Sequence, residues 1–599
     1  MAKLGQLFKE ARERKGSSFR EIEAATGLWP EYVRALEKGD YSKFASTGHL
    51  RSALRLYARY LNLDVREVLA LWEQTSSNQR PAARETRGES PGAWYQTLTI
   101  ALAALLTVGV CAVAGFYTYQ WLRSRGATEG VSGATGPGGT ILLPSPTPVP
   151  SPSVYLPISS TSIPRYVITV TLDYAGHSLV AQERIDYANR TGEMLSEIVL
   201  NVFPNHEPDV FTLNSLSLEF GTGPMPAAHS LEGMILHVPL PEELGPGQVG
   251  TLFLDFTLDL PYINPQDSFT AGSLGWSERA VDVGHWYPAL APLFPGEGWY
   301  TFDYYPIGDP YVMEEAEYDV RIRAPEGVIL VGGGEEEQEG EVWRYRMPQA
   351  RSFAFAASDQ YVSHRIDAAD VTVISYYFPE HELAGLDVAQ VAAEALETYG
   401  EEFGVPYPYG YYRVAESEFA GGMEFSAVSF LGSLWYETYP GGVRSQLIAL
   451  LVHEVSHQWW YGLVGSDQVK QPWLDEALAT FSESVFYELR YPHDALWLWD
   501  FEVLNWPRGG PIDGAIYDYA DEASYMNAVY RRGALFLADL RQAVGAQHFQ
   551  EFLRDYCQTQ SHALGYSADF FTVLSRHTDE DLSTLLEEYF AQSPDEGAP

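Results

Sequence analysis

The sequence predicts a multidomain chain: a small all-α bundle, a single transmembrane helix, a β-rich domain and then a mostly α domain. Three observations support this prediction. The 599 residues exceed what one hydrophobic core serves, 30 consecutive residues carry no charge, and the hydrophobic period changes from about 2 to about 3.6 residues near position 375. The expected parts are 1–75 helical, 76–92 basic linker, 93–122 transmembrane, 123–164 Gly/Ser/Pro-rich linker, 165–375 β-rich and 376–595 mostly α.

Charge divides the chain into two regions. Residues 1–125 hold 18 Lys and Arg against 12 Asp and Glu, whereas the remaining residues hold 20 against 68. An acidic body of this kind is repelled by nucleic acid, which argues against DNA as a partner of residues 126–599. The asymmetry indicates that the two regions work in different environments.

The uncharged run from Ala93 to Leu122 is longer than the ~20 residues that a helix needs to cross a bilayer. Aromatic residues lie near both of its ends, where the membrane interfaces would be. A core helix of this length would carry a polar stripe, and a cleaved signal peptide would not follow 92 other residues. The run therefore predicts one membrane span, and basic residues on both sides leave its orientation to be decided by the N-terminal domain.

Residues 3–70 form several helical patterns, separated by a glycine turn and a proline start. The arrangement is typical of a helix-turn-helix module. Through the segments GDYSKF and RLYARYLNL it resembles the cytoplasmic domain of RodZ-type bacterial cell-shape proteins, which also precedes a single membrane span. The resemblance implies a cytoplasmic N-terminus, a remainder outside the bacterial cell, and docking on an actin-like filament. DNA binding is the weaker alternative, because the helix from Trp29 to Gly39 has few basic residues.

A tether and two folded regions follow. Residues 126–164 are rich in Gly and Ser and then in Pro, which predicts a partly extended spacer. From Tyr166 onward, short alternating runs such as YVITVTLDY and GTLFLDFTLDL predict strands up to about residue 375. Helical patterns then dominate, among them SQLIALLVHEVSHQWWYGL and LDEALATFSESVFYEL.

The first of these helical patterns contains LVHEVSHQWW, residues 451–460. His453 and His457 are four residues apart and so lie on one face of a helix, with Glu454 close by. Two imidazoles in this arrangement can bind zinc, and the carboxylate can take the proton of a zinc-activated water. A core helix with two histidines is the alternative, because the bare pattern arises by chance in roughly a few per hundred chains of this length.

A catalytic zinc needs a third protein ligand, and Glu476 in WLDEALATF follows His457 after eighteen intervening residues. With this spacing the chain resembles the gluzincin aminopeptidases, the membrane alanyl aminopeptidase (aminopeptidase N) family, peptidase family M1, over roughly residues 165–592. The resemblance implies a thermolysin-like (zincin) catalytic domain that binds one Zn²⁺ per chain through His453, His457 and Glu476. It also implies that Glu454 is the general base and then the general acid.

The segment GGMEF lies where this family has a Gly-Ala-Met-Glu-Asn motif. The resemblance implies that the segment lines the substrate and that Glu424 binds its free α-amine. The substrate-binding residues taken from this match are Gly421, Gly422, Met423 and Glu424. Gly422 for Ala and Phe425 for Asn depart from the motif, and they bear on the shape of the substrate site more than on the carboxylate.

The segment YRRGALFL matches the family's Tyr-x-Lys-Gly-Ala, with Arg532 where Lys is usual. The match implies that Tyr530 donates a hydrogen bond to the oxyanion. HWYPALAP and GDPYVMEEAEYDVRIRAPEGV resemble the end of the family's β-rich domain. Many members carry a further helical domain over the cleft, which has no counterpart before Pro599, so we expect an open cleft that admits longer peptides.

The sequence therefore predicts a membrane-anchored zinc aminopeptidase that acts on peptides. Two alternatives stay open. One is a transmembrane peptide-binding sensor coupled to the helix-turn-helix module, which the full set of ligands, base and tyrosine disfavours. The other is a zinc endopeptidase, which Glu424 disfavours because a carboxylate at the amine site favours a free N-terminus.

Overall fold

A computed structural model describes residues 2–15, 17, 30–39, several single positions between 57 and 72, and 163–591 except 222, 264–272, 295 and 369. The chain divides into two compact units, Met1–Tyr155 and Leu156–Pro599. The predicted transmembrane helix at 93–122, the linker at 76–92 and most of the linker at 123–164 lie outside the described residues. No helix in the described part of the chain is long and apolar enough to cross a membrane.

The first unit contains helices α1 (Ala2–Lys15) and α3 (Pro30–Lys38), which pack together. Proline begins α3 because the first helical position needs no N–H donor. Phe8 of α1 stacks on Tyr57, with ring centroids 5.0 Å apart. Glu37 accepts hydrogen bonds from the Arg12 guanidinium at 2.6 and 3.0 Å and from the Tyr57 hydroxyl at 2.6 Å. The half-buried Glu37 thus connects α1 and α3 to Tyr57.

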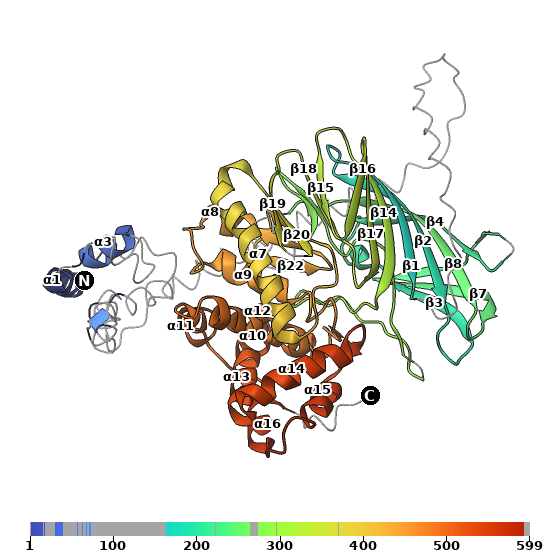
Figure 1. Cartoon of the computed structure of the whole chain (residues 1–599). Coiled ribbons are helices and arrows are strands. Elements are labelled where there is room, and N and C mark those ends of the chain that lie inside the picture. The colour runs from blue at the N-terminus through green and yellow to red at the C-terminus, as the bar shows by residue number, and fades with distance from the viewer. Residues whose placement is uncertain are drawn as a thin grey trace, which may run out of the picture. The chain divides into compact units, whose positions relative to one another are not determined.

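The second unit begins with strands, drawn teal to green in Figure 1. They are β1 (Arg165–Asp173), β2 (Ser178–Ala188), β3 (Leu195–Asn201), β4 (Phe211–Glu219), β5 (Met225–Pro226), β6 (Ser230–Glu232), β7 (Ile235–Leu244), β8 (Val249–Asp259), β9 (Leu274–Trp276), β10 (Val281–Val283), β11 (Ala289–Leu290), β12 (Leu293–Phe294), β13 (Gly298–Trp299), β14 (Ala316–Arg323), β15 (Ile329–Gly332), β16 (Glu335–Glu339), β17 (Val342–Ala350) and β18 (Phe355–Ser358). The largest sheet has the order β16-β17-β14-β1-β2-β8-β4-β5, and two smaller sheets have the orders β15-β18-β10-β9 and β11-β3-β7-β6. Alternate residues of β8 are buried, as the period of two predicts.

A mixed sheet opens the rest of this unit, from residue 362 onward, which the sequence predicts to be the catalytic part, and the helices drawn yellow to red in Figure 1 follow. Its strands are β19 (Val362–Ala368), β20 (Val371–Tyr377), β21 (Tyr411–Ser417), β22 (Gly422–Phe425) and β23 (Val428–Gly432), in the order β19-β20-β21-β23-β22. The helices are α7 (Glu382–Phe403), α8 (Ser433–Glu437), α9 (Gln446–Ser456), α10 (Trp473–Arg490), α11 (Ala495–Leu498), α12 (Glu522–Met526), α13 (Gly533–Val544), α14 (Ala546–Gln560), α15 (Ser567–Leu574) and α16 (Ser583–Tyr589). Because β20 pairs with β21 and β19 pairs with β20, the sheets change near residue 360, whereas the hydrophobic period changes near 375.

The β-rich and catalytic parts meet around Arg351, whose side chain is 2% exposed. Its guanidinium donates to the carbonyl oxygens of Met313, Tyr461, Leu463 and Ala563, at 2.7 to 3.3 Å. These acceptors come from a loop of the β-rich part and from two separate segments of the catalytic part. A fully desolvated cation is stable only when such bonds replace water, so Arg351 holds the two parts together.

Glu183 interrupts the apolar face of β2. The register places it opposite Ile168 of β1 and Leu254 of β8. It is 2% exposed, and neither of its carboxyl oxygens has a hydrogen-bond partner among the described residues. Burial raises the pKa of Glu183 well above its ordinary value, so the folded chain binds this proton more tightly than the unfolded chain does.

We expect the substitution Glu183→Met to stabilise the β-rich part at pH 8 by about 1 to 4 kcal/mol, because an apolar side chain replaces a buried unpaired acid. Between the ordinary pKa of Glu and the raised folded pKa, the unfolded chain releases a proton that the folded chain keeps, so the cost to stability grows as the pH rises. The gain measured by thermal unfolding should therefore be larger at pH 8 than at pH 5. A stability loss at both pH values would show that Glu183 has a stabilising partner.

Candidate metal and catalytic site

Helix α9 carries the two histidines of the HEVSH segment. Ser445 caps its first turn by accepting a hydrogen bond from the Ile448 N–H at 3.3 Å, the role for which serine is favoured at this position. Almost every later residue of the helix is buried. The helix ends at Ser456, and His457 is its C-cap residue with helical backbone angles, one turn beyond His453, so both imidazoles lie on the same side.

Three side chains from α9 and α10 converge on one point. His453 Nε2 lies 3.1 Å from His457 Nε2 and 3.2 Å from Glu476 Oε2, and His457 Nε2 lies 3.6 Å from the same oxygen. Glu476 reaches this point from the first turn of α10. Ligands bound about 2.0–2.2 Å from a tetrahedral zinc ion are roughly 3.3–3.6 Å apart, so the observed triangle has the size that zinc requires. The donor set and its geometry fit a zinc ion.

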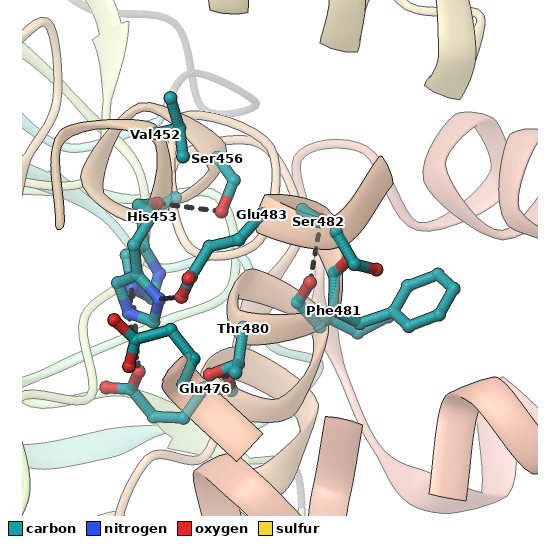
Figure 2. Close-up of polar contacts among 12 residues, drawn as sticks. Val452, His453, Ser456, Glu476, Thr480, Phe481, Ser482 and Glu483 are labelled. Carbon is teal, nitrogen blue, oxygen red and sulfur yellow. Dashed lines mark hydrogen bonds and ion pairs between the residues drawn. The ribbon is translucent and has the colours of Figure 1, made fainter. Parts of the chain in front are cut away.

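The other ring nitrogen of each histidine is held by a second carboxylate from α10. His453 Nδ1 lies 2.9 Å from Glu483 Oε1, as Figure 2 shows. His457 Nδ1 lies 2.7 Å from Asp475 Oδ1 and 3.0 Å from the Trp460 carbonyl oxygen. These contacts fix the orientation of both rings and direct each Nε2 toward the metal position. Helix α10 therefore supplies one ligand and orients the other two.

The Glu454 side chain packs against Gly422 of strand β22. A Cβ atom built on Gly422 would lie 2.1 Å from Glu454 Oε1, so the carboxylate occupies the space that a side chain at this position would need. Glu454 Oε2 is buried and has no hydrogen-bond partner in the described structure. The glycine that departs from the family motif thus makes room for the carboxylate beside the metal ligands.

Strand β22 also brings Glu424 to this place. The Glu424 carboxylate, the Glu454 carboxylate and a ring nitrogen of His457 all lie within 4.8 Å of one another. Residues alternate across a strand, so Met423 and Phe425 face the other way and pack in an apolar cluster. Among the described strands of this sheet β22 lies at the edge, with β23 on its other side.

The four residues predicted to bind substrate therefore differ in their placement. Gly422 and Glu424 lie next to Glu454, whereas the Met423 side chain is buried on the opposite face of the strand. Gly421 precedes β22, and its carbonyl oxygen accepts a hydrogen bond from the Gly432 N–H at 2.8 Å. Gly421 thus fixes the start of the strand.

Tyr530 lies on a π-helical segment, η6 (Asn527–Arg532), between α12 and α13. Its ring is parallel to the His453 imidazole, with centroids 5.8 Å apart and an interplanar angle of 8°. Burial and then the charge of Glu476 raise the pKa of Tyr530 well above its ordinary value, so the phenol keeps its proton and serves as a donor. π-Helical turns often occur at functional sites, and this one aims a tyrosine at the metal ligands.

Arg532, which stands where the family has Lys, points away from the metal ligands. Its guanidinium lies 5.0 Å from the centroid of the Tyr589 ring and donates to the carbonyl oxygen of Glu588. Both partners belong to α16. This departure from the family segment therefore concerns the packing of α13 against α16.

Buried acids dominate the electrostatics of the site. Burial raises the pKa of Glu454 to about 7 and raises the pKa of Glu424 well above its ordinary value. Against burial, hydrogen bonds from His453 and then His457 hold the pKa of Glu476 below its ordinary value. Glu476 is thus ionised and ready to bind a metal, and the other two carboxylates favour any cation brought beside them.

Sequence patterns do not single out three further acids at this site, Asp475, Glu483 and Asp309. Glu483 follows Glu476 by two helical turns and Asp475 precedes it directly, so helical spacing on α10 is the signal that would find both. Asp309 lies in a loop of the β-rich part, where no periodicity points to it.

Comparison with known families agrees with this geometry. Residues 388–589 match the peptidase family M1 domain, and residues 7–68 match a helix-turn-helix domain. The predictions of a family M1 peptidase domain and of an N-terminal helix-turn-helix module are thereby confirmed. His453, His457 and Glu476 lie inside the matched domain, and their donor set and geometry fit a zinc ion.

Relatives are similar over parts of the chain. Aminopeptidase M1 of Arabidopsis thaliana is 26% identical over 219 residues, which cover 34% of this chain and 25% of the relative. Leucyl aminopeptidase of Saccharolobus solfataricus is 22% identical over 320 residues, which cover 49% of this chain and 40% of the relative. The chain thus matches about a quarter to two fifths of these two relatives.

A solved structure extends the similarity to the β-rich part. The M1 zinc metallopeptidase from Deinococcus radiodurans is 17% identical, with a TM-score of 0.51, and the match covers 71% of this chain and 93% of that one. At this identity the likeness concerns the fold, in which a β-rich domain precedes a helical catalytic domain.

We expect the substitution Glu483→Gln to weaken zinc binding about 10- to 100-fold, because the hydrogen bond that orients His453 loses its charge. Competition with a chelator of known affinity measures the zinc Kd. Glu488→Gln is the matched control, since Glu488 lies on the same helix but pairs with Arg541 at the surface, at 2.7 Å. Equal zinc affinities of the two variants would contradict the role given to Glu483.

Proposed function

We propose that this chain is a membrane-anchored zinc metallo-aminopeptidase that removes N-terminal residues from peptides. The observation that carries the proposal is the meeting of a metal triad, the Glu454 carboxylate and the Glu424 carboxylate in one buried place. A His, His, Glu triad alone serves several hydrolases. A second carboxylate within 4.8 Å of the base adds a partner for the ammonium group of a free N-terminus.

His453, His457 and Glu476 would hold the zinc ion, which when bound would supply an activated water molecule and polarise the substrate carbonyl. Glu454 takes a proton from the attacking water and then donates it to the departing amine. Burial raises the pKa of Glu454 to about 7, so the carboxyl exchanges protons readily near neutral pH. Tyr530, which keeps its proton, donates a hydrogen bond to the oxyanion.

The substrate's position follows from strand β22. Glu424 binds the α-ammonium group, and this contact places the first peptide bond beside Glu454. An edge strand offers backbone groups to a peptide that lies alongside it. An N-terminal acetyl group removes the positive charge, so the acidic site excludes blocked peptides.

The anchor is the uncharged run 93–122, which spans the membrane of a bacterial cell once. The helix-turn-helix domain lies in the cytoplasm and docks on a filament-like protein, and the catalytic part lies outside the membrane. The order of domains and the resemblance to RodZ-type proteins support this topology. DNA is the weaker partner, because α3 offers only Arg34 and Lys38 as basic side chains.

The test uses the zinc-loaded full-length protein and one peptide in free and N-acetylated form, with products followed by mass spectrometry. We expect stepwise loss of N-terminal residues from the free peptide only. The variant Glu454→Gln should bind zinc normally and lose about 10²–10⁴-fold in kcat, because it cannot accept the proton.

Two other outcomes would contradict the proposal. Internal cleavage of both peptide forms would mean an endopeptidase. Full occupancy by zinc without cleavage would favour the alternative of a transmembrane peptide-binding sensor.

Gly422 allows a second test of the base. The added methyl group of Gly422→Ala would lie 2.1 Å from Glu454 Oε1 and must displace the carboxylate. We expect kcat to fall on the order of a hundredfold, with KM and zinc content unchanged, because displacements of about 1 Å carry such penalties. Gly410→Ala is the control, since a Cβ there meets no atom within 4 Å. An unchanged kcat for Gly422→Ala would show that the base does not act from this position.

A further inference from the structure

Asp309 is a buried acid that the mechanism above does not use. It lies in the loop between β13 and β14 of the β-rich part and is 8% exposed. Its Oδ1 atom is buried and has no hydrogen-bond partner among the described residues. An unpaired carboxylate in this state costs stability, so its retention points to a ligand that brings a positive charge.

Packing places this loop beside the metal ligands. Gly308 adopts a φ of +68°, and a Cβ there would lie 2.7 Å from the hydroxyl of Tyr525. The Tyr525 ring packs edge-on against Tyr530, with centroids 5.7 Å apart, and Tyr530 in turn lies parallel to His453. Two hydrogen bonds tie the same loop to the catalytic part: Tyr305 donates to the Tyr519 carbonyl at 3.1 Å, and Tyr517 donates to the Asp303 carbonyl at 2.8 Å.

Electrostatics agree with this placement. Burial, and then the charges of Glu476, Glu454 and Asp475, raise the pKa of Asp309 well above its ordinary value. Burial also raises the pKa of Glu424. The charge of His457 opposes this shift, and the charge of Asp309 adds to it. The site therefore holds one carboxylate more than the metal, the base and the α-ammonium group require.

The Tyr311 N–H donates to the Asp309 carbonyl at 2.7 Å and Tyr525 faces Gly308, so aromatic residues lie beside this extra carboxylate. Its charge contributes, after burial, to raising the pKa of four tyrosines, Tyr304, Tyr311, Tyr525 and Tyr530. Two of them are held by stacking on histidines: Tyr304 on His206, with centroids 3.9 Å apart, and Tyr311 on His285, with centroids 3.4 Å apart. Ring faces beside a carboxylate bind guanidinium and ammonium groups through cation–π contacts and charged hydrogen bonds.

We propose that Asp309, together with these tyrosines, binds the cationic side chain of the substrate's first residue and gives the enzyme a preference for N-terminal Arg or Lys. The inference rests on the proposed aminopeptidase function, in which Glu424 already pairs with the α-ammonium group. Asp309 is then the specificity residue that the β-rich part contributes. The Asp309 carboxylate gains an ionic partner only when a peptide with a basic first residue is bound.

The experiment compares three peptides that differ only in the first residue, which is Arg, citrulline or Leu. Citrulline keeps the shape of Arg without its charge. We expect the zinc-loaded full-length protein to prefer Arg, and Asp309→Asn to lower kcat/KM for the Arg peptide by roughly a hundredfold while changing the other two little. The melting temperature of Asp309→Asn should stay equal or rise, because an unpaired buried charge is removed. Asp303→Asn, an exposed acid on the same loop, is the control and should keep the preference.

Binding separates this proposal from the proposed function. The Kd values of the three peptides are measured by calorimetry on zinc-loaded Glu454→Gln, with and without Asp309→Asn, so that turnover is not needed. A preference for Arg that disappears with Asp309→Asn supports the inference. Cleavage of all three peptides without an Arg preference overturns the inference and leaves the aminopeptidase in place. An equal loss for all three peptides in Asp309→Asn also overturns it, because Asp309 would then act on the α-amine or on the fold.

Discussion

The site depends on the two carboxylates that hold the Nδ1 atoms of His453 and His457. Glu483 and Asp475 lie on the same helix as the third ligand, so α10 sets the position of all three metal-binding atoms relative to one another. Both acids are almost fully desolvated, and removing either partner of such a pair is costly. The surrounding core of α7, α9 and α13 must therefore form before the histidines have a defined orientation. A metal ion then offsets the repulsion among acids that burial has brought together.

The part of the site that sequence predicts well is the part that is local in the chain. Helical geometry alone places His453 and His457 on one side of α9, and the spacing to Glu476 identifies the third ligand. Glu424 and Tyr530 come from distant segments, so only the family resemblance could select them among many similar residues. Asp309 has neither kind of signal, since it lies in an irregular loop and depends on packing for its position. The side chains of β22 show a further limit, because strand alternation turns Met423 away from the site.

For the fold, the sequence predicts the order of the β-rich and helical parts better than the boundary between them. A β-rich region followed by a helical region is evident from hydrophobic periodicity, and the fold agrees with that order. The periodicity cannot tell which sheet a strand joins, because pairing is a long-range property. Strands β19 and β20 have the pattern of the preceding region but belong to the sheet of the catalytic part, in which β20 pairs with β21 and β19 with β20. Arg351 likewise belongs to the β-rich part in sequence, but its guanidinium donates to carbonyl oxygens of the catalytic part, those of Tyr461, Leu463 and Ala563.

The π-helical segment that carries Tyr530 has a consequence for how such a site can change. In an α-helix each residue turns the chain by roughly 100°, so the wider turn of η6 changes the direction of every side chain that follows it relative to those before it. Loss of a single residue between α12 and α13 would restore regular helix and would rotate Tyr530 away from the imidazole that it faces. Apart from Tyr530 itself, substitutions in this segment are therefore tolerable by ordinary packing rules, whereas deletions and insertions are not. A lineage that retains this chemistry must therefore keep the length of the segment as well as Tyr530.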